Sequence, residues 1–279
     1  MKVLIFGDLF GKIWRNALIK EIDSLREEYK PDFVVVNWEN MTSGRWPIEK
    51  HMKLLHDIWV DLFTSWDHIF DNEKNLFPYL ERDDCKIIRP ANYYESEYYD
   101  IPGDWYRIIS NNNKHLLVIN LLSETFTRDH VYNPFLKADA ILKKIHKKIE
   151  KNNIKLNWII IDFHKEVASE GYGMQEFLDG RVSFIFGTHT HIQTNDDNIT
   201  ELWTWLLSDV GMIWAKKSII GSDFWSLKKR FLTGIQKWKI EQSLDKNYIM
   251  NGVLVDINEQ TMKCTSIKKI KKFGNLANY

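Results

Sequence analysis

Two histidines that are two residues apart, His189 and His191, directly follow the apolar segment 182–186. This segment is short, β-branched and aromatic, and Gly180 and Gly187 bound it, which predicts a buried β-strand. Open α/β sheets bind ligands just beyond the carboxyl ends of their strands, and side chains two apart in extended backbone point the same way. Because neutral imidazole is the commonest metal ligand, the pair indicates either a metal site or a polar loop with solvated histidines.

Four further apolar segments also run into polar loops, and we expect strands there at 3–6, 33–36, 62–64 and 158–161. The loops that follow carry residues able to bind metals or protons: Asp8, Glu39, Asn40, Asp67, His68 and His164. If the strands are parallel, all five loops lie at one edge of the sheet. Carboxylates crowded at this edge repel one another, which raises their pKa values. Bound divalent cations relieve this repulsion. Mixed carboxylate and imidazole donors suit Mn, Fe or Zn.

The candidate ligands are too many for one tetrahedral site. They suffice for two metals that share a bridging carboxylate, at a separation of about 3.5–4 Å. Each residue alone has an ordinary structural role open to it: Asp8 as a helix cap, Asn40 as a turn residue, and His164 as a hydrogen-bonded polar side chain. The coincidence at five strand ends favours the metal site over these separate roles.

The elements that must position these loops alternate between strand and helix. Apolar residues recur at helical spacing over 16–29, 48–58 and 138–151, and further strands are expected at 116–120, 203–207 and 252–256. This order predicts βαβ units and a parallel sheet. Residues 92–104 are interpreted as an irregular excursion, and the lysines of 143–151 and 268–272 as solvated surface. Since no repeat, linker or boundary is visible, a single domain over 1–279 is expected.

Composition narrows the class of protein. The 279 residues include 38 Lys plus Arg and 38 Asp plus Glu, a balance that argues against nucleic-acid binding by bulk charge. Two cysteines, Cys85 and Cys264, form no disulfide framework and suit a reducing compartment. Apolar runs are too short for a membrane span or a signal peptide. We therefore expect a cytoplasmic protein with no membrane partner and no stable nucleic-acid complex.

Seven motifs, in order along the chain, carry a family resemblance. They are Gly-Asp-Leu-Phe-Gly-Lys (7–12), Asn-Trp-Glu-Asn (37–40), Arg-Pro-Ala-Asn (89–92), Asp-Phe-His-Lys-Glu (162–166), Leu-Asp-Gly-Arg-Val (178–182), Gly-Thr-His-Thr-His-Ile-Gln-Thr (187–194) and Ser-Asp-Val-Gly-Met (208–212). Together they resemble the YmdB-like bacterial metallophosphoesterases over nearly the whole chain. The resemblance implies an α/β protein with the four-layer α/β/β/α metallophosphoesterase fold, a calcineurin-like sandwich. It also implies a dinuclear Fe or Mn centre, with Zn as a further option, and hydrolysis of 2′,3′-cyclic nucleotides to 3′-nucleotides.

The same resemblance implies a role for each candidate residue. The ligands of one metal would be Asp8, Glu39, Asn40 and His191. Those of the other would be Glu39, Asp67, His164 and His189, so that Glu39 bridges. The metals would supply a hydroxide for attack on phosphorus, and His68 would protonate the leaving 2′ oxygen, a contribution of about 10²–10⁴-fold in rate.

The implied partner is a small cyclic nucleotide. A homo-oligomer stays open, because a group of tyrosines suits either an interface or ordinary packing: Tyr93, Tyr94, Tyr98 and Tyr99.

Two departures from the family pattern affect this inference. Asp67 stands where the family has Asn, which keeps a metal donor and adds negative charge. Tryptophan stands where a family glycine is expected at eight positions: Trp14, Trp38, Trp46, Trp59, Trp66, Trp105, Trp203 and Trp214. The chain holds 12 Trp and only 13 Gly, although glycine averages about 7% of residues. A single direction of change indicates a single cause, and we favour UGA codons decoded as glycine over genuine substitution with repacking.

Two classes of function follow from these observations. The first is a working phosphodiesterase, on a 2′,3′-cyclic nucleotide or on another phosphate ester. The second is a catalytically impaired relative that keeps the fold as a regulatory or scaffolding protein. Every expected ligand position carries a residue able to coordinate metal, which favours the enzyme.

Overall fold

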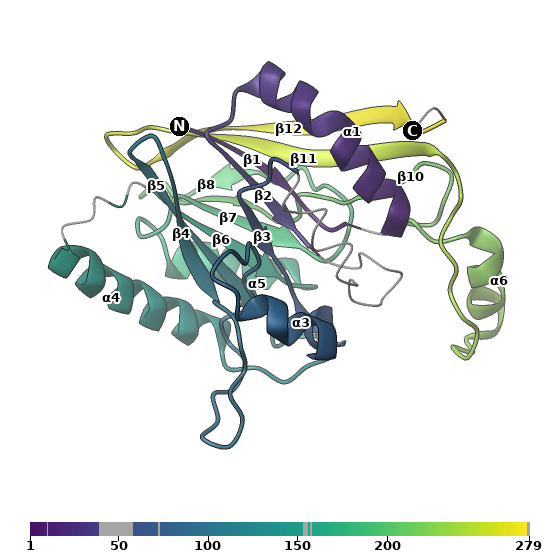
Figure 1. Ribbon diagram of the computed structural model, residues 1–279, viewed down its shortest axis with the longest axis horizontal. Coiled ribbons are helices and arrows are strands. Elements are labelled where there is room, and N and C mark those ends of the chain that lie inside the picture. Colours follow the sequence, from purple (N-terminus) through teal and green to yellow (C-terminus); the bar gives the residue numbers. More distant parts are fainter. Residues whose placement is uncertain (10, 39–57, 72, 153–155, 157, 278–279) are drawn as a thin grey trace.

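The computed structural model describes residues 1–9, 11–38, 58–71, 73–152, 156 and 158–277, and its strands form two sheets (Figure 1). The first sheet has the order β10-β11-β1-β2-β3, with β12 paired to β11. Its strands are β1 (Lys2–Phe6), β2 (Phe33–Asn37), β3 (Leu62–Thr64), β10 (Ile213–Ala215), β11 (Asn247–Ile257) and β12 (Cys264–Asn275). Here β1, β2 and β3 are parallel, whereas β11 runs antiparallel to β1.

The second sheet has the order β4-β5-β6-β7-β9-β8. Its strands are β4 (Tyr106–Asn111), β5 (Lys114–Leu122), β6 (Trp158–His164), β7 (Phe184–Thr188), β8 (Asn198–Ile199) and β9 (Trp205–Leu207). The four strands β5, β6, β7 and β9 are parallel to one another. Their carboxyl ends therefore lie at one edge of this sheet.

Helices cover the outer faces of both sheets (Figure 1). The helices on these faces are α1 (Gly11–Tyr29), α3 (Glu73–Leu80), α4 (Pro134–Asn152) and α5 (Ala168–Phe177), whereas α6 (Phe224–Thr233) projects to one side of the sandwich (Figure 1). A 3-10 turn, η1 (Asp67–Phe70), follows β3. One apolar cluster lies between α1 and the first sheet, another lies between the sheets, and a third joins the second sheet to α4 and α5.

Strand alternation explains these three apolar layers. In β1, Leu4 and Phe6 belong to the cluster beneath α1, whereas Val3 and Ile5 belong to the cluster between the sheets. Because both faces of the strand are buried, its sequence is continuously apolar. The mixed α/β sandwich of four layers is thereby confirmed.

The expectation of one parallel sheet is wrong. The strands expected at 3–6, 33–36 and 62–64 lie in the first sheet, and those at 158–161 and 182–186 correspond to β6 and β7 of the second. The strand expected at 252–256 is the long antiparallel β11. An apolar run reports burial on both faces, and it carries no signal for the sheet to which the strand belongs.

Several element boundaries also differ from expectation. Helix α1 begins at Gly11 rather than at residue 16, and β7 spans Phe184–Thr188 rather than 182–186. The lysines of 268–272 lie in β12, paired along β11, and not in an irregular terminus, whereas the side chains of Lys268 and Lys271 are exposed as expected. The helix expected at 48–58 falls almost wholly outside the described residues. Among the helices that are described, none is long and apolar enough to cross a membrane.

Candidate active site

Strand ends from both sheets meet at one place. Asp8 follows β1, Asp67 follows β3, and His164 is the last residue of β6. The backbone N–H of His189, just beyond β7, donates to Asp8 Oδ2 at 2.9 Å, and His189 Nδ1 lies 2.8 Å from His164 Nε2. The donors thus come from two sheets that face each other, and not from one edge. Glu39 and Asn40 lie outside the described residues.

The two histidines of the segment 187–191 do not lie in extended backbone. His189 has φ +110° and His191 has φ +69°, so the expectation that both side chains point the same way from a strand is wrong. Such conformations cost about 1–3 kcal/mol each and gather at functional sites. The turn directs His191 Nε2 to within 3.8 Å of Asp8 Oδ2, while His189 faces His164.

Gly187, near the end of β7, lets the backbone of Ser208 approach closely. A Cβ built on Gly187 would lie 1.8 Å from the carbonyl oxygen of Ser208, where no side chain fits. The amide of Val210 donates to the carbonyl of Gly187 at 3.0 Å, which joins β7 to the segment that follows β9. The close backbone approach explains glycine at this position.

A buried hydrogen-bond chain orients His164. Asp162 Oδ1 accepts from the Thr188 hydroxyl at 2.9 Å, and Asp162 Oδ2 accepts from Asn37 Nδ2 at 2.7 Å and from the hydroxyl of Thr64. Since Thr188 gives its only proton to Asp162, it must accept from His164 Nδ1, 2.9 Å away. The lone pair of His164 is therefore on Nε2, and a ring held in this way by its other nitrogen is typical of metal-ligating histidines.

Burial keeps the three histidines neutral. It holds the pKa of His164 well below its usual value, and the charge of His189 adds to the effect. Burial also lowers the pKa of His191 to about 3 and lowers the pKa of His189, although Glu166 opposes that shift. Neutral imidazole is the form that binds metals.

A neutral His189 ring cannot donate a hydrogen bond to both Glu166 and His164. Its Nε2 lies 3.0 Å from Glu166 Oε2 and its Nδ1 lies 2.8 Å from His164 Nε2, yet a neutral ring has one N–H. If that proton serves Glu166, two lone pairs face each other, and a cation between them would satisfy both. Asp67 Oδ1 is also buried without a hydrogen-bond partner in the described part of the chain. The chemistry of these donors fits a divalent metal.

The donors have suitable chemistry for a metal, but those that the structure describes do not form a complete metal-binding group. Across the described residues, no group of three or more His, Cys, Asp or Glu side chains is placed to hold one metal ion. The indole of Trp66 lies among the histidines, in contact with the rings of His164 and His189.

His68 lies in a separate cluster of charged groups. Its Nδ1 is 2.7 Å from Asp71 Oδ2 and 3.0 Å from Arg128 Nη1, and Arg128 pairs with Asp71 at 2.6 Å. Asp71 accepts the Nδ1 proton, which leaves Nε2 as the nitrogen that exchanges a proton with a ligand. Neither neighbour is among the residues predicted from the sequence. The three-residue spacing from His68 could have found Asp71, whereas nothing local indicates Arg128.

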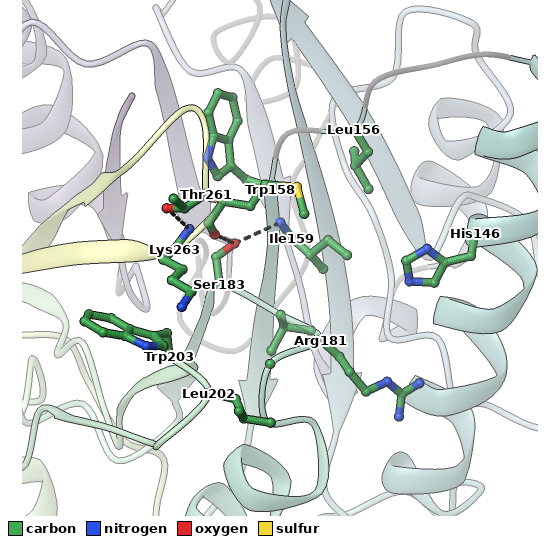
Figure 2. Close-up of a pocket in the computed structure, with 13 residues that line it drawn as sticks. His146, Leu156, Trp158, Ile159, Arg181, Ser183, Leu202, Trp203, Thr261 and Lys263 are labelled. Carbon is green, nitrogen blue, oxygen red and sulfur yellow. Dashed lines mark hydrogen bonds between the residues drawn. The ribbon is translucent and has the colours of Figure 1, made fainter.

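The cavity in Figure 2 lies at the amino-terminal ends of β6 and β7, opposite to the ends that carry the candidate active site. Its volume is about 460 Å³, and it is lined by Trp158 and Ile159 at the start of β6, by Ser183 ahead of β7, and by Trp203 and Lys263. The strand-end donors are not among its lining residues. This hollow is therefore distinct from the candidate active site.

Comparisons with known proteins show what this chain is similar to. A family model described as YmdB-like protein matches residues 4–270. The 2′,3′-cyclic-nucleotide 2′-phosphodiesterase of Bacillus subtilis (strain 168) is 33% identical over 271 residues, which cover 97% of this chain and 96% of the relative.

Two solved structures are similar over nearly their whole length. One is a hypothetical protein from Thermus thermophilus, with a TM-score of 0.83 and 26% identity, covering 98% of this chain and 99% of that chain. The other is a novel phosphatase from Mycoplasma pneumoniae, with a TM-score of 0.85 and 26% identity, covering 99% of this chain and 94% of that chain.

Proposed function

Because the chain belongs to the YmdB-like family and is a phosphoesterase by that membership, we propose that it hydrolyses 2′,3′-cyclic nucleotides to 3′-nucleotides with two bound metals. The observation that carries the proposal is the 33% identity to a 2′,3′-cyclic-nucleotide 2′-phosphodiesterase. Fe or Mn as the metals, with Zn as a further option, and a cytoplasmic location belong to the same proposal.

The residues that would hold the metals are those that the strand ends bring together. Asp8 and His191 would serve one metal, and Asp67, His164 and His189 the other. Glu39 as a bridge and Asn40 as a ligand complete the proposed set from outside the described residues. When bound, the metals would acidify water at neutral pH and neutralise phosphate oxygens.

His68 would supply the proton for the leaving group. Its Nδ1 is held by Asp71 at 2.7 Å, so the proton to be transferred resides on Nε2. The His68 side chain is 34% exposed, which leaves it accessible to a substrate. Arg128 pairs with the second carboxylate oxygen of Asp71 and helps to hold His68 and Asp71 in one orientation.

Leaving-group chemistry tests the role of His68. The departing 2′ alkoxide needs a proton, whereas the p-nitrophenolate of bis-(p-nitrophenyl) phosphate does not. We expect His68→Gln to lower kcat on 2′,3′-cyclic AMP by about 10²–10⁴-fold and to change kcat on the nitrophenyl ester little. An equal loss on both substrates would show that His68 is not the acid. His115→Gln, at the start of β5, is the matched control.

Product identity tests the reaction itself. Chromatography of a 2′,3′-cyclic AMP digest should show 3′-AMP. Exclusive 2′-AMP would contradict the proposed bond, and turnover of the nitrophenyl ester alone would contradict the substrate class.

A second candidate is a regulatory or scaffolding protein without catalysis. The specific observation that favours it is the Trp66 indole among the site histidines. Metal analysis of the purified protein after reconstitution separates the two candidates, because the second would retain less than one equivalent of Mn, Fe or Zn.

A further inference from the structure

The side chain of Trp66 lies inside the candidate active site. It precedes η1, is 5% exposed, and contacts three site histidines. Its ring centroid is 3.6 Å from that of His164, 5.1 Å from that of His189 and 5.5 Å from that of His68. Aromatic pairs normally lie about 4.5–7 Å apart, so the contact with His164 is compressed.

The indole is poorly accommodated where it lies. Its Nε1 is buried and has no hydrogen-bond partner within the described ranges, which is costly for a buried donor. Asp67 Oδ1, on the next residue, also lacks a partner there, so the two groups do not satisfy each other.

The backbone at this position does not require glycine. Trp66 has φ −154° and an extended conformation, so a positive φ is not the reason for a glycine at this position. The remaining reason for a small residue is space, because a residue without a side chain would leave the faces of His164 and His189 open.

We infer that Trp66 closes the half of the site formed by Asp67, His164 and His189, and that removing its side chain opens this half to a divalent cation. The inference rests on the proposed function for the identity of the cation site, and it concerns a chain with tryptophan at position 66. Glycine at this position, as the decoding hypothesis predicts, would leave this half open for the second metal of the proposed function. Two donors of suitable chemistry, the lone pair on His164 Nε2 and His189 Nδ1, belong to rings that the indole contacts. The partnerless Asp67 Oδ1 belongs to the residue that follows Trp66. With the indole in place, the described residues form no closed three-donor group.

Metal stoichiometry tests this inference without any measure of catalysis. The wild type, Trp66→Gly and Trp66→Ala are stripped with chelator, reconstituted with Mn²⁺, desalted and analysed for metal, and Mn²⁺ affinity is measured by titration calorimetry. We expect both variants to retain about one more equivalent than the wild type and to bind that equivalent at least tenfold more tightly. Trp59→Gly, at an exposed tryptophan that contacts Arg26, should behave as the wild type.

The outcomes separate this inference from the proposed function. A wild type that binds two tight equivalents overturns the inference, whether or not the variants fold. Variants that keep the native circular dichroism spectrum and bind no more metal than the wild type also overturn the inference. Variants that gain metal and leave 2′,3′-cyclic AMP intact support the inference and refute the proposed substrate.

Discussion

Trp203 has a backbone conformation that disfavours every residue with a Cβ. It lies in the turn between β8 and β9 with φ +79°, and its amide donates to the Thr200 carbonyl at 3.2 Å. Its indole is 45% exposed and lies against Lys263, whose Nζ is 4.6 Å from the ring centroid (Figure 2). The choice of residue at position 203 is therefore limited mainly by the left-handed backbone of the turn. The indole adds only a half-exposed contact with Lys263.

Comparing Trp203→Gly with Trp203→Ala isolates the backbone effect, because both variants lose the indole. A left-handed conformation costs a residue with a Cβ about 1–2 kcal/mol, and glycine loses about 0.5–1 kcal/mol more than alanine through chain entropy. We expect the glycine variant to be the more stable by about 0.5–1 kcal/mol. In a chain of this size, that difference raises Tm by about 2 °C.

The assay is urea unfolding followed by circular dichroism, with Tm as a second readout. Trp225 supplies the control pair, because it is exposed in the first turn of α6 and has an ordinary helical backbone. At position 225 we expect the alanine variant to have a free energy of unfolding up to about 1 kcal/mol higher than that of the glycine variant. If alanine is also the better residue at 203, the turn does not require the left-handed conformation and this reasoning is refuted.

Three further measurements test other parts of the structure. Asp162→Ala removes the acceptor of buried donors from β2, β3 and β7, so the free energy of unfolding in urea should fall by about 3 kcal/mol; a loss below about 1 kcal/mol would contradict the network. Burial raises the pKa of Asp209 to about 7, so between about pH 4 and pH 7 the folded state binds a proton that the unfolded state has lost. The contribution of Asp209 to the free energy of unfolding should therefore fall as pH rises through this range. Asp209→Asn should flatten this dependence on pH, and an unchanged dependence would exclude Asp209 as its source. Burial raises the pKa of Cys264 to about 12 and also raises that of Cys85, so Ellman's reagent at pH 8 should react only after unfolding, and fast reaction of the native protein would exclude this burial.

The coding DNA tests the decoding hypothesis directly. We expect UGA codons at the eight tryptophan positions that match family glycines, and UGG codons there would refute it.

Much of the candidate site could be predicted because buried parallel strands have a simple signature. A continuously apolar run that ends in a polar residue located Asp8, Asp67 and His164, since such runs are buried on both faces and end at the sheet edge. Assignment of the strands to two sheets could not be predicted, because an apolar run carries no information about its neighbours. The family resemblance supplied that part.

Two features of the site have no signal in the local sequence. Arg128 reaches His68 across 60 positions of the chain, and no pattern near either residue indicates the contact. The left-handed backbone at His189 and His191 also departs from the conformation that two-residue spacing predicts. Both features arise from tertiary packing, which overrides the local rule.

The position of β1 in its sheet has a consequence for synthesis of the chain. β1 lies between β2 and β11, and β11 begins only at Asn247. At about 5–20 residues per second, β1 waits tens of seconds on the ribosome with one apolar edge unpaired. Such an edge is a template for aggregation. The strand that presents Asp8 is thus made long before the strand that completes its pairing, so the nascent chain depends on protection of this edge until β11 emerges.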